Sequence, residues 1–246
     1  MINRIVPALK RRRKWAQVGV YFLRTKPVQT RQLTIAGKVI PLLFPPGEKE
    51  RHHYELGEIY LADCYKLRGL KEIHTIVDIG ANVGLFSMIA RHHFPQARID
   101  AYEPNPGLLE IIESHLRPLG INLYHEAVGL ENGRSSPVNT RGSLDYQVMV
   151  DPSGDLPMAG VSTVLERIGG TIDLLKMDCE GGEWEILQSN EFMRNVRTLA
   201  MEYHPRKQNV PVLNELILLL RRHKFHQVEI HQRVDESWGL LHATRA

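Results

Sequence analysis

The sequence predicts an α/β protein with a doubly wound, mostly parallel sheet and a small N-terminal cap. From residue 72 onward, segments rich in Val, Ile and Leu that favour strands alternate with segments whose apolar residues recur at helical spacing. The 246 residues and the 43% apolar content suffice for one large core with small additions. Glycine turns and acidic residues follow several predicted strands, as is typical of ligand sites at the carboxyl edge of such a sheet.

The chain before residue 72 is predicted to form a basic arm and a cap, so we divide it into residues 1–71 and a main domain over residues 72–246. Within the cap, residues 32–44 predict a short hairpin that turns at Ala36–Lys38. Residues 55–67 predict a helix that leads to the first strand of the main sheet.

The N-terminal arm differs from the rest of the chain in charge. Residues 1–47 contain ten of the 31 Lys and Arg residues and none of the 28 Asp and Glu residues, which leaves an acidic main domain. The basic run 10–14 precedes a short apolar set. Two interpretations stay open: residues 1–27 anchor the protein on an anionic membrane surface, or they form a solvated arm or a helix packed on the domain.

The first strand of the main domain leads into a glycine turn. Thr75–Ile79 favours a strand, Gly80 and Gly84 follow, and an apolar, helix-compatible run begins at Leu85. Glycines let the backbone turn sharply and let a ligand lie against bare main chain, while the helix N-terminus offers unpaired N–H groups. This pattern of strand, turn and helix predicts a site for a nucleotide-like molecule.

Spacing within the turn separates two cofactor classes. A dinucleotide site requires G-x-G-x-x-G, so that a pyrophosphate lies at the helix N-terminus. The order here is D-x-G-x-N-x-G, with Asp78 inside the turn and Asn82 where the second glycine would stand. A carboxylate repels a pyrophosphate and attracts a cation, such as the amino acid end of S-adenosylmethionine. The turn therefore favours a sulfonium cofactor over NAD.

The second strand supports this interpretation. Arg98–Tyr102 predicts a strand that ends at Glu103, before a proline-rich turn and an apolar-periodic helix over 108–116. A carboxylate at the carboxyl end of this strand can accept hydrogen bonds from both hydroxyls of a ribose. We therefore predict that Glu103 holds the ribose of an adenosine-containing cofactor.

Later segments complete the predicted sheet. A third strand is predicted over 122–128, and the polar stretch 129–160 is predicted to hold edge strands and mobile loops. A strand, a helix, a strand, a helix and two further strands follow, near residues 172–178, 184–187, 198–203, 212–223, 227–231 and 239–244.

In a doubly wound sheet the ligand lies outside the carboxyl ends of the strands. That rule brings six ionisable side chains to one edge of the sheet: Asp78, Glu103, Glu126, Asp178, Glu180 and His204. Like charges that lie close together are costly unless a cation or a proton compensates them. A cationic cofactor meets part of that requirement.

Several segments of the chain resemble the FkbM-type S-adenosylmethionine-dependent methyltransferases: 77–84, 103–104, 127–129, 173–183 and 202–204. The most specific is the L-L-K-x-D-x-E-G-x-E block. The resemblance covers residues 72–230 and implies a class I methyltransferase fold, which is Rossmann-like with a seven-stranded sheet. It further implies methyl transfer to a hydroxyl oxygen on a sugar, a glycan or a polyketide-like small molecule. Cys179 and Gly182 depart from the family pattern, and neither departure removes a charged group.

The turn, the strand ends and the resemblance together assign two groups of site residues. We expect the cofactor, S-adenosylmethionine, to be held by Asp78, Gly80, Asn82, Gly84, Glu103, Glu126 and Ala127. We expect the catalytic residues to be Asp178, His204 and Glu180.

A hydroxyl nucleophile needs a positioned base, which contributes ~10²- to 10⁴-fold in rate. Asp178 and His204 are the candidates, and His204 has a near-neutral intrinsic pKa. Glu180 and Glu183 are three residues apart and are expected near one face of the helix after the fourth strand. Glu180 there positions the acceptor hydroxyl, or joins Asp178 in holding a divalent cation. We expect no metal, because Asp178 and Glu180 without a third clear ligand make a poor site.

Two rival functions come from other classes. A nucleic-acid-binding or nucleic-acid-modifying protein would use the basic arm for phosphates. The acidic main domain and the 7% aromatic content argue against it, so we expect a small-molecule or glycan acceptor and no nucleic acid. An NAD-dependent oxidoreductase would need the glycine that Asn82 replaces.

Cysteine and hydropathy patterns favour a reducing compartment. Cys64 and Cys179 have no paired spacing that suggests zinc or a disulfide framework. No stretch of the sequence is long and apolar enough to span a bilayer. We therefore expect a cytoplasmic protein, with association at the inner membrane surface as the alternative that the basic arm leaves open.

Overall fold

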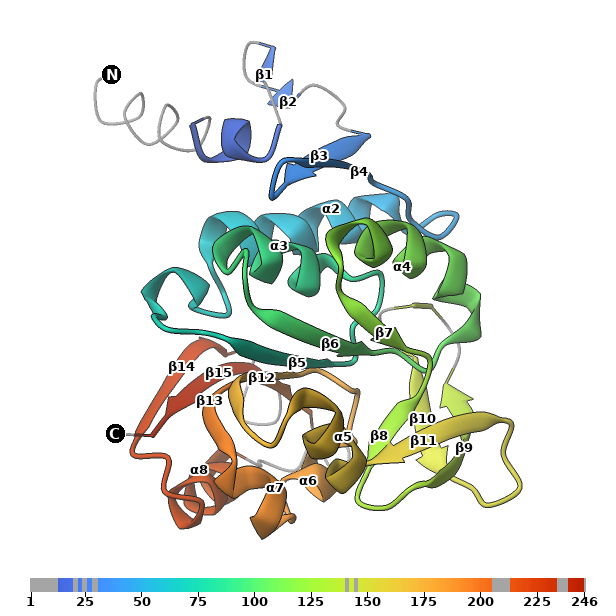
Figure 1. Cartoon of the computed structure of the whole chain (residues 1–246), viewed down its shortest axis with the longest axis vertical. Helices are drawn as coiled ribbons and strands as arrows, with labels where there is room; N and C mark the ends of the chain where they lie inside the picture. Colours follow the sequence, from blue (N-terminus) through green and yellow to red (C-terminus); the bar gives the residue numbers. More distant parts are fainter. Residues whose placement is uncertain are drawn as a thin grey trace.

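The computed structural model describes residues 13–19, 22–23, 26–27, 31–139, 142–143, 146–204, 213–233 and 239–245. In this part of the chain, helices cover both faces of a central sheet, and a smaller sheet lies to one side of it (Figure 1). The arrangement confirms the predicted α/β class.

The central sheet has seven strands in the order β14-β15-β13-β12-β5-β6-β7. Neighbouring strands are parallel, except that β15 runs antiparallel to both β13 and β14. The chain moves outward from β5 to β7 and then returns to β12 on the other side of β5, so the topological switch point lies between β5 and β12. The strands are β5 (Thr75–Ile79), β6 (Arg98–Tyr102), β7 (Asn122–Tyr124), β12 (Ile172–Met177), β13 (Val196–Tyr203), β14 (Gln227–Arg233) and β15 (Gly239–Thr244). The predicted doubly wound, mostly parallel sheet is confirmed.

Each face of the sheet has its own layer of helices and its own buried apolar cluster. One layer, which lies above the sheet in Figure 1, comprises α2 (Lys49–Gly57), α3 (Leu85–His93) and α4 (Leu109–Leu116). The other comprises α5 (Val161–Ile168), α6 (Glu183–Ile186), α7 (Asn190–Arg194) and α8 (Leu213–Arg222). Shorter elements are β1 (Phe22–Leu23), β2 (Lys26–Pro27), β3 (Gln32–Ile35), β4 (Lys38–Pro41), η1 (Glu58–Ala62), η2 (Leu67–Gly69), η3 (Pro106–Leu108) and η4 (Arg117–Leu119).

Strand β12 shows why the sheet forms where it does. All six residues of β12, Ile-Asp-Leu-Leu-Lys-Met, are buried. Four of them are apolar, as is typical of a strand that helices cover on both faces. Asp173 near its start accepts hydrogen bonds from the backbone N–H groups of His74, at 2.7 Å, and Thr75, at 3.1 Å. This carboxylate therefore joins the starts of β12 and β5.

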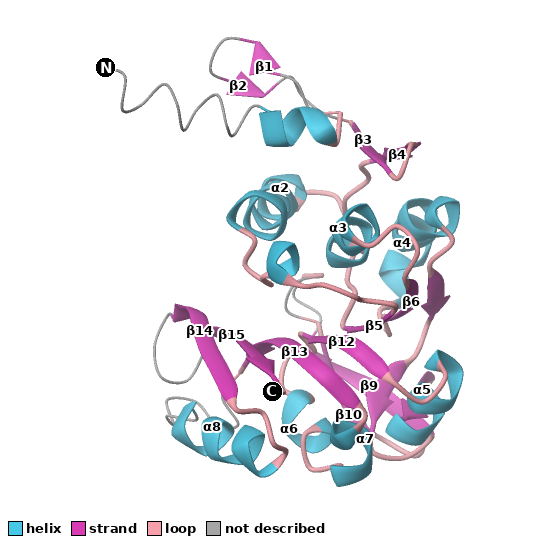
Figure 2. Ribbon diagram, turned by 60° about the vertical axis from the view of Figure 1, so that its left-hand side comes forward, coloured by secondary structure: helices cyan, strands magenta, loops and turns pink. Residues whose placement is uncertain are grey.

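The cap contains the predicted hairpin of β3 and β4. Ala36 and Gly37 form its turn with φ angles of 47° and 78°. Leu33 and Ile40 are fully buried in the same apolar cluster as residues of α3 and α4, over which the hairpin lies (Figure 2). The cap and the main domain thus share one hydrophobic core.

The described part of the N-terminal arm also packs inward. Residues 13–17 are helical, and Trp15 and Val18 are buried, with 9% and 0% exposure. The Tyr60 hydroxyl donates a hydrogen bond to the carbonyl oxygen of Lys14 at 2.6 Å. This packing agrees with the packed-helix interpretation of the arm, although residues 1–12 lie outside the described residues. Among the described residues, no helix combines the length and the apolar character that crossing a membrane requires.

The helix predicted over 55–67 has different bounds. Helix α2 begins at Lys49 and ends at Gly57, and the π-helical segment η1 continues the helical path to Ala62. It stops there because Asp63 and Lys66 adopt left-handed conformations, with φ angles of 58° and 57°. The prediction was therefore right about a helix in the cap and wrong about where it starts and stops.

The third predicted strand is split between two sheets. Only β7 belongs to the central sheet, and the next strand, β8 (Ala127–Gly129), pairs with β11 instead. The second sheet has the order β10-β9-β11-β8, with β9 (Gly133–Asn139), β10 (Gln147–Val150) and β11 (Leu156–Gly160). The stretch 129–160, predicted to hold edge strands and mobile loops, thus supplies three of the four strands of this sheet, and its residues 140–141 and 144–145 lie outside the described residues. Because the chain leaves the central sheet before Glu126, that residue and Ala127 reach the carboxyl edge.

Candidate active site

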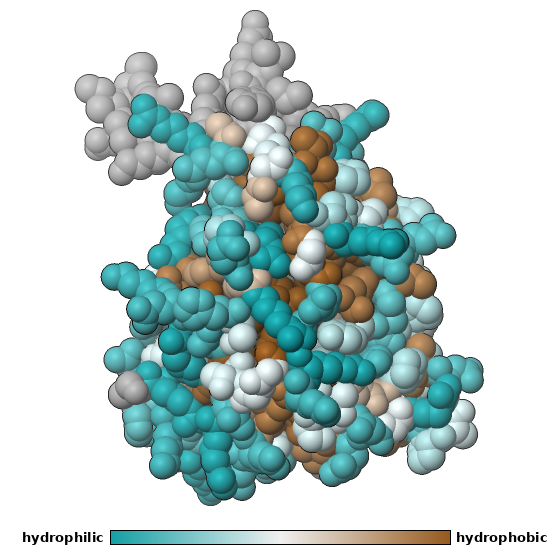
Figure 3. All heavy atoms as spheres, viewed as in Figure 1, coloured by the Kyte–Doolittle hydropathy of each residue, from teal (hydrophilic) through white to brown (hydrophobic). Residues whose placement is uncertain are grey.

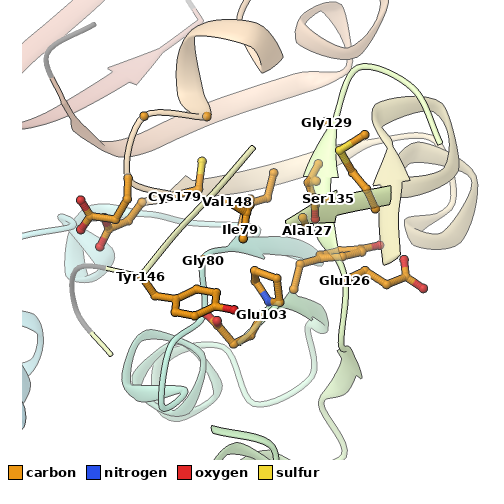
Figure 4. Close-up of a pocket in the computed structure, with 18 of the residues that line it drawn as sticks. Ile79, Gly80, Glu103, Glu126, Ala127, Gly129, Ser135, Tyr146, Val148 and Cys179 are labelled. Atoms are coloured by element: carbon orange, nitrogen blue, oxygen red, sulfur yellow. The ribbon is translucent and has the colours of Figure 1, made fainter. Parts of the chain in front are cut away.

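A cavity of about 340 Å³ opens at the carboxyl ends of β5, β6 and β12. Its wall combines the glycine turn after β5, the end of β6, the start of β8 and the loop after β12, as Figure 4 shows. The second sheet closes another side through Val148 and Met158. The cavity therefore lies at the topological switch point, where doubly wound sheets bind ligands. Five predicted cofactor residues line it: Gly80, Asn82, Glu103, Glu126 and Ala127.

The glycine turn brings two loops into backbone contact. Gly80 has a φ of +77°, and a Cβ at this position would lie 1.8 Å from the carbonyl oxygen of Asp178. Gly84 has a φ of +84° at the start of α3, where a Cβ would lie 2.8 Å from the side chain of Leu116. Gly80 therefore shapes the cavity wall, whereas Gly84 lies behind it and allows close packing of α3 on α4.

Glu103 connects the turn to the end of β6. Its carboxylate accepts hydrogen bonds from the backbone N–H groups of Asn82, at 2.7 Å, and Asn105, at 2.9 Å. The residue is 5% exposed, and this burial raises its pKa to about 7 against the opposing effect of those hydrogen bonds. Figure 4 shows the ring of Tyr146 reaching over the cavity toward Glu103. Each carboxylate oxygen accepts one of these bonds and has capacity to accept another from a bound ligand.

Asp78 lies beneath the turn and is absent from the cavity wall. Its carboxylate is fully buried, accepts a hydrogen bond from the Ser87 hydroxyl at 2.6 Å, and lies 3.3 Å from the ammonium nitrogen of Lys176. The expectation that Asp78 itself attracts a cationic ligand is therefore wrong, because Lys176 already compensates its charge. Asp78 supports the turn from below.

Lys176 is a site residue whose role the sequence left unassigned. Its buried Nζ donates a hydrogen bond to the carbonyl oxygen of Gly80 at 2.6 Å and lies 3.9 Å from the Asp178 carboxylate. Burial would lower the pKa of Lys176, but the charges of Asp78 and Asp178 outweigh it and raise the pKa. The ammonium group thus fixes the glycine turn to the end of β12.

Glu126 reaches the cavity with its charge already paired. Arg167 on α5 donates two hydrogen bonds to the Glu126 carboxylate, at 2.7 and 3.2 Å. The same guanidinium lies over the ring of Tyr124, 4.3 Å from its centroid, and Tyr124 stacks on Tyr102. This network holds the start of β8 in place beside the cavity.

The loop after β12 places Glu180 and Glu183 differently, relative to each other, from the prediction. Asp178 and Glu180 line the cavity, and Glu180 has a positive φ of 54°. Glu183 begins α6, is fully buried, and accepts the backbone N–H groups of Cys179 and Gly181, both at 2.9 Å. Glu180 and Glu183 therefore do not share a helical face, since the chain turns at Glu180 before α6 begins.

His204 at the end of β13 joins this acidic group from outside the cavity wall. Its Nδ1 lies 3.1 Å from Glu183, and its Nε2 lies 3.5 Å from Glu180 and 3.7 Å from Glu202. Burial would lower the pKa of His204, but the hydrogen bond to Glu183 and the surrounding carboxylates raise it to about 10. The ring is therefore an imidazolium at neutral pH, so His204 already holds the proton that a base would have to accept.

Of the two candidate bases, Asp178 and His204, Asp178 is the one that lines the cavity. Burial raises its pKa, and the positive charges of Lys176 and His204 offset this in part. Ligand atoms of Asp178, Glu183 and His204 lie within 4.8 Å of one another, a spacing that could hold a metal ion. Glu183 and the protonated His204 already satisfy each other there, so the arrangement is complete as a hydrogen-bonded ion pair.

Comparison with known proteins gives this site a family. The "Methyltransferase FkbM domain" family matches residues 78–227. "Methyltransferase sdnD" of Sordaria araneosa is 29% identical over 189 residues, which are 59% of this chain and 72% of that protein. "AMB antimetabolite synthetase AmbE" of Pseudomonas aeruginosa is 24% identical over 232 residues, 73% of this chain but 11% of that protein. Among solved structures, a precorrin-6Y C5,15-methyltransferase from Geobacter metallireducens has a TM-score of 0.47 and 17% identity, covering 75% of this chain and 87% of that one.

Proposed function

This chain belongs to the FkbM methyltransferase family, and on that premise we propose that it transfers a methyl group from S-adenosylmethionine to a hydroxyl oxygen of a small-molecule acceptor. The observation that carries the proposal is the family match over residues 78–227, which spans the glycine turn, Glu103 and the loop after β12. The names of the relatives, a methyltransferase and an antimetabolite synthetase, support a natural-product, sugar or polyketide-like acceptor over a macromolecule.

The residues of the cavity fit S-adenosylmethionine. Gly80 lines the cavity without a side chain, and its missing Cβ lets the turn pack directly on the backbone of Asp178 at the cavity wall. Glu103 would accept hydrogen bonds from the ribose hydroxyls, and Asn82, Glu126 and Ala127 would line the nucleoside. Among the described residues that line the cavity, there are several carboxylates and no Lys or Arg. That wall suits a ligand with a sulfonium and an amine, and it disfavours the pyrophosphate of NAD.

The side chains after β12 would then manage the acceptor and its proton. S-adenosylmethionine, when bound, supplies an electrophilic methyl group on a sulfonium. Asp178 takes the proton of the acceptor hydroxyl, because its carboxylate lies on the cavity wall and burial raises its pKa, which makes it a stronger base than an exposed aspartate. Glu180 orients that hydroxyl from the same wall. His204 is a positioning residue, since its imidazolium holds Glu180 and Glu183 in place.

A methyl-transfer assay tests this assignment. Formation of S-adenosylhomocysteine is measured over a panel of hydroxylated small molecules with the wild-type protein and the Asp178→Asn variant. We expect transfer to at least one hydroxyl and a loss of ~10²- to 10⁴-fold in kcat for Asp178→Asn with little change in cofactor affinity. Full activity of Asp178→Asn would contradict the role of Asp178, and transfer only to nitrogen or carbon acceptors would contradict O-methylation.

A further inference from the structure

An open groove of about 1010 Å³ adjoins the cavity, and we call it the acceptor groove. The groove and the cavity share Val148, Met158 and Glu180 among the residues that line them, so the two spaces lie side by side. Anything bound in the acceptor groove would therefore lie next to the proposed site of methyl transfer.

One side of the acceptor groove is apolar although it faces solvent. Val138 and Val150 from the second sheet, and Leu130 just after β8, line it and are 56%, 51% and 39% exposed. Exposed large apolar residues that gather in one groove indicate a surface for a partner or ligand. This side of the groove therefore suits an apolar molecular body.

All the charged residues described in the lining of the acceptor groove are acidic. Its acidic residues are Glu131, Glu180, Glu185 and Glu215, and among the described residues that line it there is no Lys, Arg or His. Glu180 is paired with His204, which lies 3.5 Å away and does not line the groove, whereas the side chains of Glu131 and Glu185 are exposed.

We propose that the acceptor groove binds the methyl acceptor, and that this acceptor has an apolar body carrying a protonated amine. The proposal rests on the proposed function, because it names the class of molecule that the same site would methylate. Attraction between an ammonium and a carboxylate at about 4 Å favours a cationic acceptor by roughly tenfold or more over an anionic analogue. Phosphorylated, nucleotide-linked and carboxylate acceptors are disfavoured for the same reason.

Three matched phenols test the proposal. Tyramine, tyrosol and 3-(4-hydroxyphenyl)propionate have similar bodies and end in an ammonium, a neutral hydroxyl and a carboxylate. Their binding to the full chain is measured by calorimetry and by the change in tryptophan fluorescence, with and without S-adenosylhomocysteine. We expect tyramine to bind at least about tenfold more tightly than the propionate, and the difference to shrink in high salt.

The charge-neutral double variant Glu131→Gln/Glu185→Gln separates groove electrostatics from general effects. It should reduce the preference for tyramine by about fivefold or more, whereas Glu166→Gln on the exposed surface of α5 should leave it unchanged. Equal affinity for the three phenols, preference for the propionate, binding of none, or an unchanged preference in the double variant would overturn the proposal.

A separate titration distinguishes failure of the proposed acceptor class from failure of the proposed function. S-adenosylmethionine is titrated into the same wild-type and variant preparations. Cofactor binding without the expected preference among the phenols overturns the acceptor class alone. Absence of cofactor binding overturns the proposed function and with it the premise of the acceptor class.

Discussion

At the residue scale, Lys176 joins the glycine turn after β5 to the loop after β12. Its ammonium contacts the carbonyl oxygen of Gly80, the buried carboxylate of Asp78 and the carboxylate of Asp178, which belong to two neighbouring strand ends. A buried charge is costly unless it is paired, so Asp78 and Lys176 each require the other. The geometry of the cavity wall depends on this pair even though neither residue needs to contact the ligand.

Removal of Lys176 should destabilise the protein strongly. Lys176→Met leaves the Asp78 carboxylate buried without its cation, and we expect the free energy of unfolding to fall by about 3–5 kcal/mol, as measured by urea denaturation. The matched change Lys71→Met on the exposed surface should stay within about 0.5 kcal/mol. The double variant Lys176→Met/Asp78→Asn should recover part of the loss. A Lys176→Met loss below about 1 kcal/mol would contradict the paired role.

The ion pair of His204 with Glu183 should make the stability of the protein depend on pH. The pKa of His204 is about 10 in the folded protein against 6.5 for an unperturbed histidine. A raised pKa means that the imidazolium contributes its full stabilisation below pH 6.5 and loses it as pH rises through 10. The stability difference between wild type and His204→Gln should therefore shrink from pH 6.5 to 10, as followed by thermal denaturation. The exposed His226→Gln variant serves as control, and a constant difference over that range would contradict the assignment.

At the element scale, the hairpin of β3 and β4 completes the core of the main domain. Ile40 is fully buried, and the residue before it, Val39, is 58% exposed. Ile40→Ala should lower the free energy of unfolding by about 2–5 kcal/mol in a single cooperative transition, whereas Val39→Ala should change it by about 0.5 kcal/mol or less. A separate early transition confined to the cap would show instead that the cap folds by itself.

Elements with strong local patterns could be predicted from the sequence, and those decided by long-range pairing could not. Strands β5 and β12 follow from their apolar runs and the turns after them. Strand β8 has only three residues, and its place in the second sheet depends on β11, about 30 residues later in the chain. Helix α5 was missed although Val161, Val164, Leu165 and Ile168 repeat at helical spacing and are buried, because it follows directly on the polar stretch 129–160.

The site shows the same division. Glycine and acidic motifs were enough to place Gly80, Glu103 and Asp178 on the cavity wall, because parallel strands end at one edge. The protonation of His204 could not be predicted, since it depends on carboxylates from several segments that only the fold brings together. The burial of Asp78 depends likewise on the pairing of β5 with β12, which places Lys176 beside it.

At the scale of the whole molecule, charge and apolar surface are distributed unevenly. The cavity and the acceptor groove are lined by carboxylates, whereas residues 1–47 hold ten basic and no acidic residues. Figure 3 shows one face on which hydrophilic residues predominate and apolar residues gather near the centre. The two helical layers cover the faces of the central sheet. The cavity lies at one edge of that sheet, at the switch point between β5 and β12.

The most direct test of the central claim is calorimetric titration of the full chain with S-adenosylmethionine and with NAD. We expect S-adenosylmethionine to bind and NAD not to bind, because the cavity wall offers carboxylates and a glycine turn without the dinucleotide spacing. Glu103→Gln should weaken cofactor binding by at least about tenfold, and Glu110→Gln on the exposed surface of α4 should leave it unchanged. Binding of NAD in place of S-adenosylmethionine, or equal cofactor affinity of wild type and Glu103→Gln, would contradict the account.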